Sequence, residues 1–310
     1  MKAMRYHSYG DSDVLVHEEA DRPVAGVGQV VVRVAGTAFN PVDVPIRAGV
    51  IREVFPVAFP HIPNYDVSGV VTEVGEGVSG WRTGDTVVAF LPMTAPGAAA
   101  EYVAVPADTL AVAPRIGELA DAAALPSVAV TAWQALFEHA GIKEGQTILI
   151  NGAGGAVGGY AVQLAKRAGA VVVATASARS ADRVHSYGAD RIVDYTKVPV
   201  PEELAGQRFD VVLHLVRTEP EETALFAGLV ADGGAFVSTT VPGPEEIGRG
   251  VRAAQMFARS DAEQLAELVR RVDAGELEIA VAERRPVTDL AAVHDAAFAG
   301  DLPGRIVLVP

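Results

Sequence analysis

The sequence predicts an α/β protein in two parts: a module of short β-strands, followed by a doubly wound parallel sheet. Up to about residue 115, short Val-rich runs alternate with glycine-rich turns, which is typical of an all-β, barrel-like module. From about residue 121, apolar strands alternate with helices of about ten residues, which indicates a parallel sheet. A glycine-rich turn, Ala153-x-Gly155-x-x-Gly158, lies early in this second part between a strand and a helix.

The β-module is expected to span residues 1–120 and to be rejoined by the last segment, residues 262–310. Its strands are predicted at residues 29–34, 67–75, 86–90 and 101–105, with turns at Gly49, Gly75, Gly77, Gly80 and Gly84. In the last segment we expect helices at 261–274 and 290–299, and strands near 278–282 and 305–309.

Residues 121–261 are expected to form the second domain. Helices are predicted at 121–140, 180–187 and 221–230, and after the glycine-rich turn, where Gly169 ends that helix. Strands are predicted at 147–151, 171–175, 191–194, 209–216 and 234–240. Ligands of such sheets bind at the carboxyl ends of the strands.

The stretch from Gln146 to Ser177 predicts a dinucleotide site, because it reads as strand, glycine-rich turn, helix and second strand. Glycines let the turn fold tightly and let the backbone approach a pyrophosphate. The phosphates would lie on the free N–H groups and the positive dipole end of the helix. The residues expected in this cradle are Ala153, Gly154, Gly155, Ala156 and Val157.

The end of the second strand favours NADPH over NADH. An NAD site usually has an acidic residue here for the ribose 2′-hydroxyl, whereas no carboxylate follows until Asp182. Ser177 and Arg179 would instead hold a 2′-phosphate, which the donor fork of arginine matches. Arg183 fits equally well as a further phosphate ligand or as a solvated charge on the helix.

Composition excludes several classes of protein. The formal net charge of −14 argues against nucleic acid or an anionic membrane as partner. The absence of cysteine rules out disulfides, thiol nucleophiles and cysteine-liganded zinc. No apolar run reaches the roughly 18 residues of a membrane span, and the start lacks the apolar core of a secretory signal, so a cytoplasmic location is expected by default.

The order of motifs along nearly the whole chain resembles one family. The motifs are Asn40-Pro-Val-Asp43, Arg47-Ala-Gly49, Asp66-Val-Ser-Gly-Val-Val-Thr-Glu-Val-Gly75, Gly84-Asp85-Thr-Val-Val88, Ala100-Glu-Tyr-Val-Ala-Val-Pro106, Thr131-Ala-Trp-Gln-Ala-Leu136, the glycine-rich turn with Tyr160-Ala-Val-Gln-Leu-Ala165, Gly188-Ala-Asp190 with Asp194-Tyr195, and Gly304-Arg-Ile-Val-Leu308. Together they resemble the zinc-free quinone oxidoreductase (zeta-crystallin-like) branch of the medium-chain dehydrogenase/reductase superfamily.

This resemblance implies a GroES-like β-module, a Rossmann domain, a homodimer, and NADPH-dependent reduction of a quinone or conjugated carbonyl. By resemblance, Asn40 and Thr131 lie near the nicotinamide, Val241 near its carboxamide, and Tyr195 on the adenosine side. From the residues alone, Asn40 before a proline also fits a turn, and Thr131 also fits the beginning of a helix.

No metal is expected. In the zinc alcohol dehydrogenases of the superfamily, a His-Glu pair lies where this chain has Tyr65 and Asp66, and His61 is a lone histidine without a partner at ligand spacing. Without zinc, hydride from the dihydronicotinamide must reach an acceptor that is already activated, such as a quinone or an α,β-unsaturated carbonyl. The protein then has to stabilise the oxyanion that develops.

Two departures from the family and one loop bear on the expected site. Related enoyl reductases carry a proton-donating tyrosine where this chain has Ile51, which favours a quinone, because a hydroquinone anion can be protonated by water. Tyr65 is the candidate for orienting a carbonyl, although a packed aromatic residue is an equal interpretation. In the second departure, Leu213 to Arg217, His214 either reaches the cofactor cleft or is buried between strand and helix, and the structural interpretation is favoured. The loop of residues 52–61 is either an apolar wall for an aromatic substrate or ordinary packing.

Two alternative functions remain open. The first is an enone or enoyl reductase that tailors a secondary metabolite. The second is an NADPH-binding sensor with little catalysis, which the missing tyrosine and the unusual strand end, Leu213 to Arg217, keep open.

Overall fold

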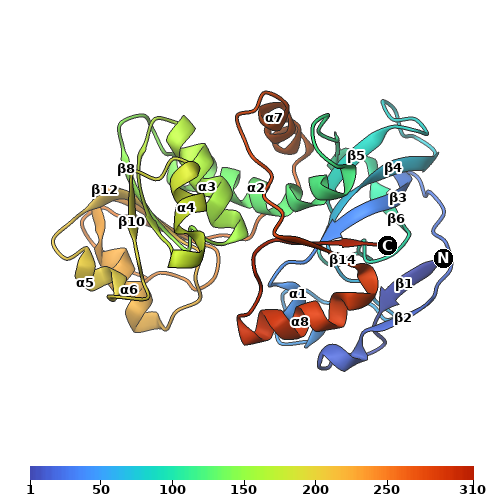
Figure 1. Cartoon of the computed structure of the whole chain (residues 1–310), viewed down its shortest axis with the longest axis horizontal. Coiled ribbons are helices and arrows are strands. Elements are labelled where there is room, and N and C mark those ends of the chain that lie inside the picture. Colours follow the sequence, from blue (N-terminus) through green and yellow to red (C-terminus); the bar gives the residue numbers. More distant parts are fainter. The chain divides into compact units, whose positions relative to one another are not determined.

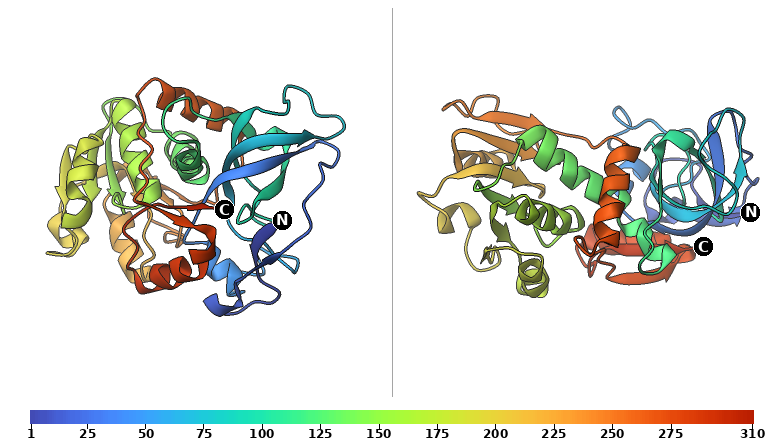
Figure 2. Two further views of the ribbon diagram at one scale, coloured as in Figure 1. Left: turned by 45° about the vertical axis from the view of Figure 1, so that its right-hand side comes forward. Right: turned by 90° about the horizontal axis from the view of Figure 1, so that it is seen from above.

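The computed structural model describes residues 1–310, and the chain divides into two compact units. Unit 1 comprises Met1–Ser127 and Arg259–Pro310, and unit 2 comprises Val128–Ala258 (Figures 1 and 2). The boundaries thus lie several residues from the expected 120/121 and 261/262. Residues 119–127 belong to unit 1 because η3 (Leu119–Ala124) packs on its strands and Asp121 pairs with Arg284.

Unit 2 is a doubly wound α/β domain. Its six parallel strands lie in the order β10-β9-β8-β11-β12-β13. The strands are β8 (Thr147–Asn151), β9 (Val171–Thr175), β10 (Arg191–Val193), β11 (Phe209–His214), β12 (Val230–Ser238) and β13 (Arg252–Gln255). The helices are α3 (Ala156–Arg167), α4 (Ala178–Ser186), α5 (Val200–Glu203) and α6 (Pro220–Gly228), together with most of α2 (Pro126–Trp133) and the π-helix η4 (Gln134–Ala140).

The strand order of unit 2 reverses direction between β8 and β11, which is the switch point where such sheets bind ligands. Helix α3 packs on β8 and β9, α4 on β10, and α6 on β11 and β12 (Figure 1). The central strands β8, β9 and β11 are nearly continuous runs of buried residues because helices cover the sheet. Leu149, Val212 and Phe236 lie in one of its core clusters.

Unit 1 is built on a seven-stranded, largely antiparallel sheet. Its order is β14-β15-β3-β4-β5-β7, with β6 paired to β3. These strands are β3 (Gln29–Ala38), β4 (Asp66–Val74), β5 (Thr86–Phe90), β6 (Tyr102–Pro106), β7 (Leu110–Val112), β14 (Glu283–Pro286) and β15 (Ile306–Val309), while β1 (Lys2–Arg5) and β2 (Val16–Glu19) form a separate pair. The helices are α1 (Asp43–Arg47), α7 (Ala262–Asp273) and α8 (Leu290–Ala299), with short 3-10 turns at η1 (Ser12–Val14), η2 (Ala107–Thr109), η3 and η5 (Val287–Asp289).

The end of the chain rejoins unit 1, as the sequence predicted. Strand β15 pairs with β3 through Val307 opposite Ala38 and Leu308 opposite Thr37. Helix α7 begins at the expected place, where the carboxylate of Asp261 accepts a hydrogen bond from the N–H of Gln264 at 3.0 Å.

Some elements differ from the expectation. The strand expected at 278–282 lies instead at β14, because its charged residues pair with the buried β15 while the more apolar stretch before it is irregular. The helix expected at 121–140 is three pieces, η3, α2 and η4. Helices α1 and α5 and strand β13 were not predicted. No helix of the chain has the length and apolar character needed to cross a membrane.

Candidate active site

The predicted glycine-rich turn lies at the carboxyl end of β8, in unit 2. Gly152 has a φ of +97°, a left-handed conformation that side chains rarely adopt. A Cβ on Gly158 would lie 2.3 Å from the carbonyl oxygen of Gly152 and 2.6 Å from the Cα of Ala153. The third glycine of the motif is therefore required for the close approach of α3 to the turn, as the fingerprint predicts.

The N-terminus of α3 is open. Gly155 is the cap residue and provides no side-chain hydrogen bond, and the N–H of Gly159 makes the first bond, to the carbonyl of Gly155 at 3.0 Å. The N–H groups before Gly159 in the first turn are thus available at the positive end of a 12-residue helix. This donor set, the N–H groups of residues 156–158, fits an anionic pyrophosphate, whereas the N–H of Gly155 is already bonded to the carbonyl of Gly152 at 3.1 Å.

The residues predicted for the 2′-phosphate lie at the start of α4. Ser177 is the cap residue of α4 and Arg179 lies in its first turn, exposed and without an ion pair or hydrogen bond. Arg183 is engaged differently: its Nη2 donates to the carbonyl of Gly154 at 2.8 Å. Arg183 therefore ties α4 to the glycine-rich turn, a role that sequence reasoning did not identify.

Of the other residues predicted to contact the cofactor, Thr131, Tyr195 and Val241 lie elsewhere in unit 2, whereas Asn40 lies in unit 1. Tyr195 follows β10 and is 51% exposed. Val241 lies in the segment just after β12, and Thr131 is a half-buried residue of α2. Tyr65 also belongs to unit 1.

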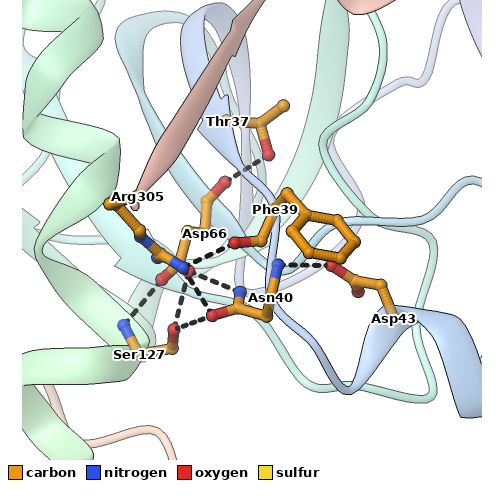
Figure 3. Close-up of polar contacts among 7 residues, drawn as sticks. All are labelled: Thr37, Phe39, Asn40, Asp43, Asp66, Ser127 and Arg305. Carbon is orange, nitrogen blue, oxygen red and sulfur yellow. Dashed lines mark hydrogen bonds and ion pairs between the residues drawn. The ribbon is translucent and has the colours of Figure 1, made fainter. Parts of the chain in front are cut away.

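Asn40 lies in a buried polar cluster of unit 1 (Figure 3). Its Nδ2 donates to a carboxylate oxygen of Asp66 at 2.8 Å, and its Oδ1 accepts from Arg305 Nη1 at 2.6 Å and from Ser127 Oγ at 3.2 Å. Its backbone N–H donates to the carboxylate of Asp43 at 2.8 Å. The orientation of the Asn40 amide is therefore fixed by the protein, with one Nδ2 hydrogen left for another acceptor.

Asp66 is the centre of this cluster. It is fully buried, and its carboxylate also accepts from the N–H of Ser127 at 2.6 Å, from Ser127 Oγ at 2.6 Å and from Arg305 Nη2 at 2.5 Å. Arg305 further donates to the carbonyl of Phe39 at 2.7 Å. The charges of Asp66 and Arg305 are paired and hydrogen-bonded, which a buried ion pair requires.

Tyr65 is adjacent to this cluster but is only 1% exposed. Its hydroxyl lies 3.2 Å from Nε2 of His61, and burial, with a smaller contribution from the charge of Asp43, holds its pKa well above the ordinary value. Burial lowers the pKa of His61 to about 4, so the imidazole is neutral near pH 7. The pair therefore offers a neutral phenol and a neutral imidazole, which donate hydrogen bonds without carrying charge.

Asp43 is buried to 1% exposure, and one of its carboxylate oxygens has no hydrogen-bond partner. Burial raises the pKa of this carboxyl to about 7. Sequence reasoning identified the Asn40 to Asp43 segment but missed Asp66, Ser127 and Arg305 as its partners. The signal was present in two quoted motifs, since Asp66 begins one and Arg305 lies in the closing one, but nothing local shows that they meet.

The chain has no group of three His, Asp or Glu side chains placed to hold a metal ion, and it has no cysteine. His61, the histidine near the position of the zinc ligands in the related alcohol dehydrogenases, faces Tyr65 and the ring of Tyr6.

Two family models match the chain in the order of its parts. The alcohol dehydrogenase GroES-like domain matches residues 26–115, in unit 1. The model described as zinc-binding dehydrogenase matches residues 187–308.

Relatives and solved structures agree with these matches. The chloroplast envelope quinone oxidoreductase homolog of Arabidopsis thaliana is 34% identical over 100% of this chain and 98% of its own length. The NADPH-dependent alkenal/one oxidoreductase of the Arabidopsis thaliana chloroplast is 38% identical over 70% of this chain and 57% of its own. The quinone oxidoreductase of Coxiella burnetii superposes with a TM-score of 0.90 and 26% identity, covering 100% and 99% of the two chains.

The expected fold, with a GroES-like unit and a Rossmann-like parallel sheet, is thus confirmed. The relatives are oxidoreductases that use nicotinamide cofactors or are named for quinone reduction. The chain belongs to the medium-chain dehydrogenase/reductase superfamily, among relatives of its quinone oxidoreductases.

Proposed function

We propose that the protein is an NADPH-dependent reductase that transfers hydride to a quinone or an α,β-unsaturated carbonyl without the help of a metal. The observation that carries this proposal is the combination in unit 2 of an open helix N-terminus with an unpaired arginine at the end of the second strand. Bound there, the dihydronicotinamide cofactor would supply the hydride. The chain's own residues bind the cofactor, orient the acceptor and stabilise developing negative charge.

The preference for NADPH rests on Arg179. This side chain is exposed and makes no ion pair, whereas Arg183 is held by the carbonyl of Gly154. A guanidinium without a partner at this strand end suits a 2′-phosphate, and no carboxylate stands there to receive a 2′-hydroxyl. Arg183 then acts as a positioning residue of the turn, while Ser177 and Arg179 contact the phosphate.

The Arg179→Ala variant tests this assignment. We expect the Kd for NADPH to rise by one to two orders of magnitude, about 1.5–3 kcal/mol for a lost charge-assisted hydrogen bond, while the Kd for NADH stays within about twofold. Arg167→Ala, which alters an exposed arginine at the other end of α3, is the matched control. Equal loss of both cofactors would contradict the 2′-phosphate assignment.

The metal-free chemistry rests on the residues of unit 1. The positions of the family's cysteine ligands cannot be filled in a chain without cysteine, and Asp66, near the family's zinc site, is bound to Arg305. Asn40 presents a fixed amide with a remaining N–H, whereas Tyr65 and His61, 1% and 2% exposed, bond to each other. The Asn40 amide suits the stabilisation of an enolate or hydroquinone anion rather than the formation of a zinc alkoxide.

A turnover assay tests the acceptor class. With NADPH as donor and a strong chelator present, a panel of quinones and a panel of enones are compared by cofactor oxidation and product analysis. We expect turnover of quinones, and turnover of enones alone would select the alternative suggested by the relative named for alkenal and enone reduction. Tight NADPH binding without turnover on either panel would support a cofactor sensor, and activity lost with chelator and restored by zinc would contradict the metal-free proposal.

Two further expectations accompany this proposal: a homodimer, and a cytoplasmic location. The first rests on the family resemblance, and the second on the absence of an apolar run long enough to span a membrane. Light scattering in solution measures the first directly, with twice the monomer mass of 32.2 kDa expected.

A further inference from the structure

A continuous line of buried hydrogen bonds crosses the carboxyl ends of three neighbouring strands in unit 2. Its members are the last residues of β9, β8 and β11, namely Thr175, Asn151 and His214. All three are 5% exposed or less. His214 and Asn151 also lie directly opposite each other in the register of the parallel sheet, at the switch point.

We call this line of hydrogen bonds the relay. Its near half, from His214 through Asn151 and Thr175, ends on the glycine-rich turn. The N–H of Gly152 donates to Thr175 Oγ1 at 2.8 Å, and Thr175 Oγ1 donates to Asn151 Oδ1 at 2.9 Å. Since the oxygen of Asn151 faces Thr175, its Nδ2 is the atom that meets His214 Nδ1, at 3.1 Å. His214 Nδ1 must therefore be an acceptor, which places the proton of the imidazole on Nε2.

The far half follows from this tautomer. His214 Nε2 lies 3.0 Å from Thr218 Oγ1, which lies 2.7 Å from Thr223 Oγ1. Thr223 Oγ1 donates to the carbonyl of Glu219, the cap residue of α6, at 3.1 Å. His214 Nε2 then donates to Thr218 Oγ1, and Thr218 Oγ1 donates to Thr223 Oγ1. With these directions every donor in this part of the relay has an acceptor.

The surroundings of His214 keep the imidazole neutral. The ring lies against Phe226 and Phe236, with ring centroids 5.0 Å and 5.9 Å away, and burial lowers its pKa to about 4. A second proton on Nδ1 would also face the N–H of Asn151, so that two donors would oppose each other.

The relay links two segments that are in contact. A Cβ on Gly152 would lie 2.9 Å from a methyl group of Val216, and the N–H of Leu215 donates to the carbonyl of Asn151 at 3.0 Å. The turn that begins at Gly152 and the segment from Leu215 to Thr218 are thus held together by both packing and hydrogen bonds. The conformation of Gly152 decides where the N–H groups at the start of α3 point.

We propose that His214 is a positioning residue for the dinucleotide: through Asn151 and Thr175 it fixes the glycine-rich turn, and through Thr218 it fixes the segment leading into α6. This proposal rests on the proposed dinucleotide site. Because His214 is fully buried, it would act on the dinucleotide only through the glycine-rich turn, at the pyrophosphate end, which NADPH and NADH share. Its loss therefore weakens both cofactors equally, unlike the loss of Arg179.

Variants of His214 separate the two halves of the relay. His214→Asn keeps an acceptor near the position of Nδ1, and His214→Gln keeps a donor near the position of Nε2. We expect His214→Gln to raise the Kd for NADPH and NADH alike by roughly tenfold, the effect of about one buried hydrogen bond, while His214→Asn retains most of the affinity. If His214 had a purely structural role, the loss of dinucleotide affinity in each variant would follow its loss of thermal stability. It would not depend on whether the hydrogen bond to Asn151 or the one to Thr218 is kept.

A second pair of variants avoids changing the buried ring. Thr175→Val removes the acceptor of Gly152 with little change of shape, and Thr147→Val, at the opposite end of β8, removes a comparable bond to Asp210. We expect both to lose similar stability, but only Thr175→Val to weaken the dinucleotide and to speed amide hydrogen exchange at Gly152. Nitrogen-15 spectra of the wild-type protein should show His214 protonated at Nε2 and not at Nδ1.

The outcomes distinguish the two proposals. Equal weakening by His214→Asn and His214→Gln, or a proton on Nδ1, would contradict the relay while leaving the dinucleotide site intact. Absence of dinucleotide binding by the wild-type protein would contradict the proposed function, and with it the role assigned to His214.

Discussion

Replacement of Arg305 by methionine tests the buried cluster around Asn40. The guanidinium of Arg305 serves three acceptors: the Asp66 carboxylate at 2.5 Å, the Phe39 carbonyl at 2.7 Å and the Asn40 amide oxygen at 2.6 Å. Methionine fills a similar volume, but it leaves a carboxylate of 0% exposure without its counter-ion. Removal of one partner from a buried ion pair costs about 3–5 kcal/mol.

Urea unfolding monitored by circular dichroism gives this free energy, with the Asp66→Asn variant and the double variant completing a cycle. Asp66→Asn removes the charge that Arg305→Met would leave unpaired. We therefore expect the double variant to lose about 1–3 kcal/mol less unfolding free energy than the two single variants lose together. Arg305→Lys retains the charge without the planar fork and should lie between the wild type and Arg305→Met. A loss below about 1 kcal/mol for Arg305→Met, or additivity within about 0.5 kcal/mol, would contradict the buried ion pair between Asp66 and Arg305.

Two further variants test the buried carboxyl of Asp43 and the close approach at Gly158. Burial raises the pKa of Asp43 to about 7, whereas an unfolded chain loses this proton near pH 4; the unfolded state therefore binds fewer protons between these values, and stability falls as pH rises. Asp43→Asn should remove a slope of at most about 1.4 kcal/mol per pH unit in this window, and an unchanged slope would contradict the assignment. Gly158→Ala places a Cβ 2.3 Å from the Gly152 carbonyl and should abolish measurable dinucleotide binding, whereas Gly228→Ala, which meets no atom within 4 Å, should not; unaltered affinity in Gly158→Ala would show that the turn tolerates the displacement.

The features predicted well from sequence are those encoded locally. The strand, turn and helix from β8 to α3 lie within one short stretch, and both the glycine spacing and the missing acid after β9 can be read without knowledge of the fold. The same holds for α7, whose cap residue, Asp261, precedes an amphipathic run. The family resemblance then supplied the order of the parts and the return of the last segment.

The features missed are those that depend on distant contacts. Arg305 and Asp66 are 239 residues apart, and no local pattern shows that they pair. Strand β14 is misplaced in the prediction because its charged sequence, Glu283–Pro286, becomes a strand only by pairing with β15. His214 was read correctly as buried, yet its partners come from a neighbouring strand and from the following segment, so its tautomer follows only from the structure.

The role of Arg183 illustrates the same limit. From the sequence, Arg183 fitted a phosphate ligand and a solvated charge equally well. The structure shows a third arrangement, in which Arg183 donates a hydrogen bond to the carbonyl of Gly154. That contact joins a residue of α4 to the glycine-rich turn 29 positions earlier. Of Arg183 and Arg179, only Arg179 has no partner within the protein.

The central claim is that this chain uses NADPH to reduce an activated acceptor. The most direct measurement is kcat/KM for one quinone with NADPH and with NADH, in the presence of a chelator, for the wild-type protein and Arg179→Ala. We expect the wild type to favour NADPH by at least about tenfold, and Arg179→Ala to remove this preference by lowering only the value for NADPH. Equal use of the two cofactors by the wild type, or no oxidation of either by any quinone or enone, would contradict it.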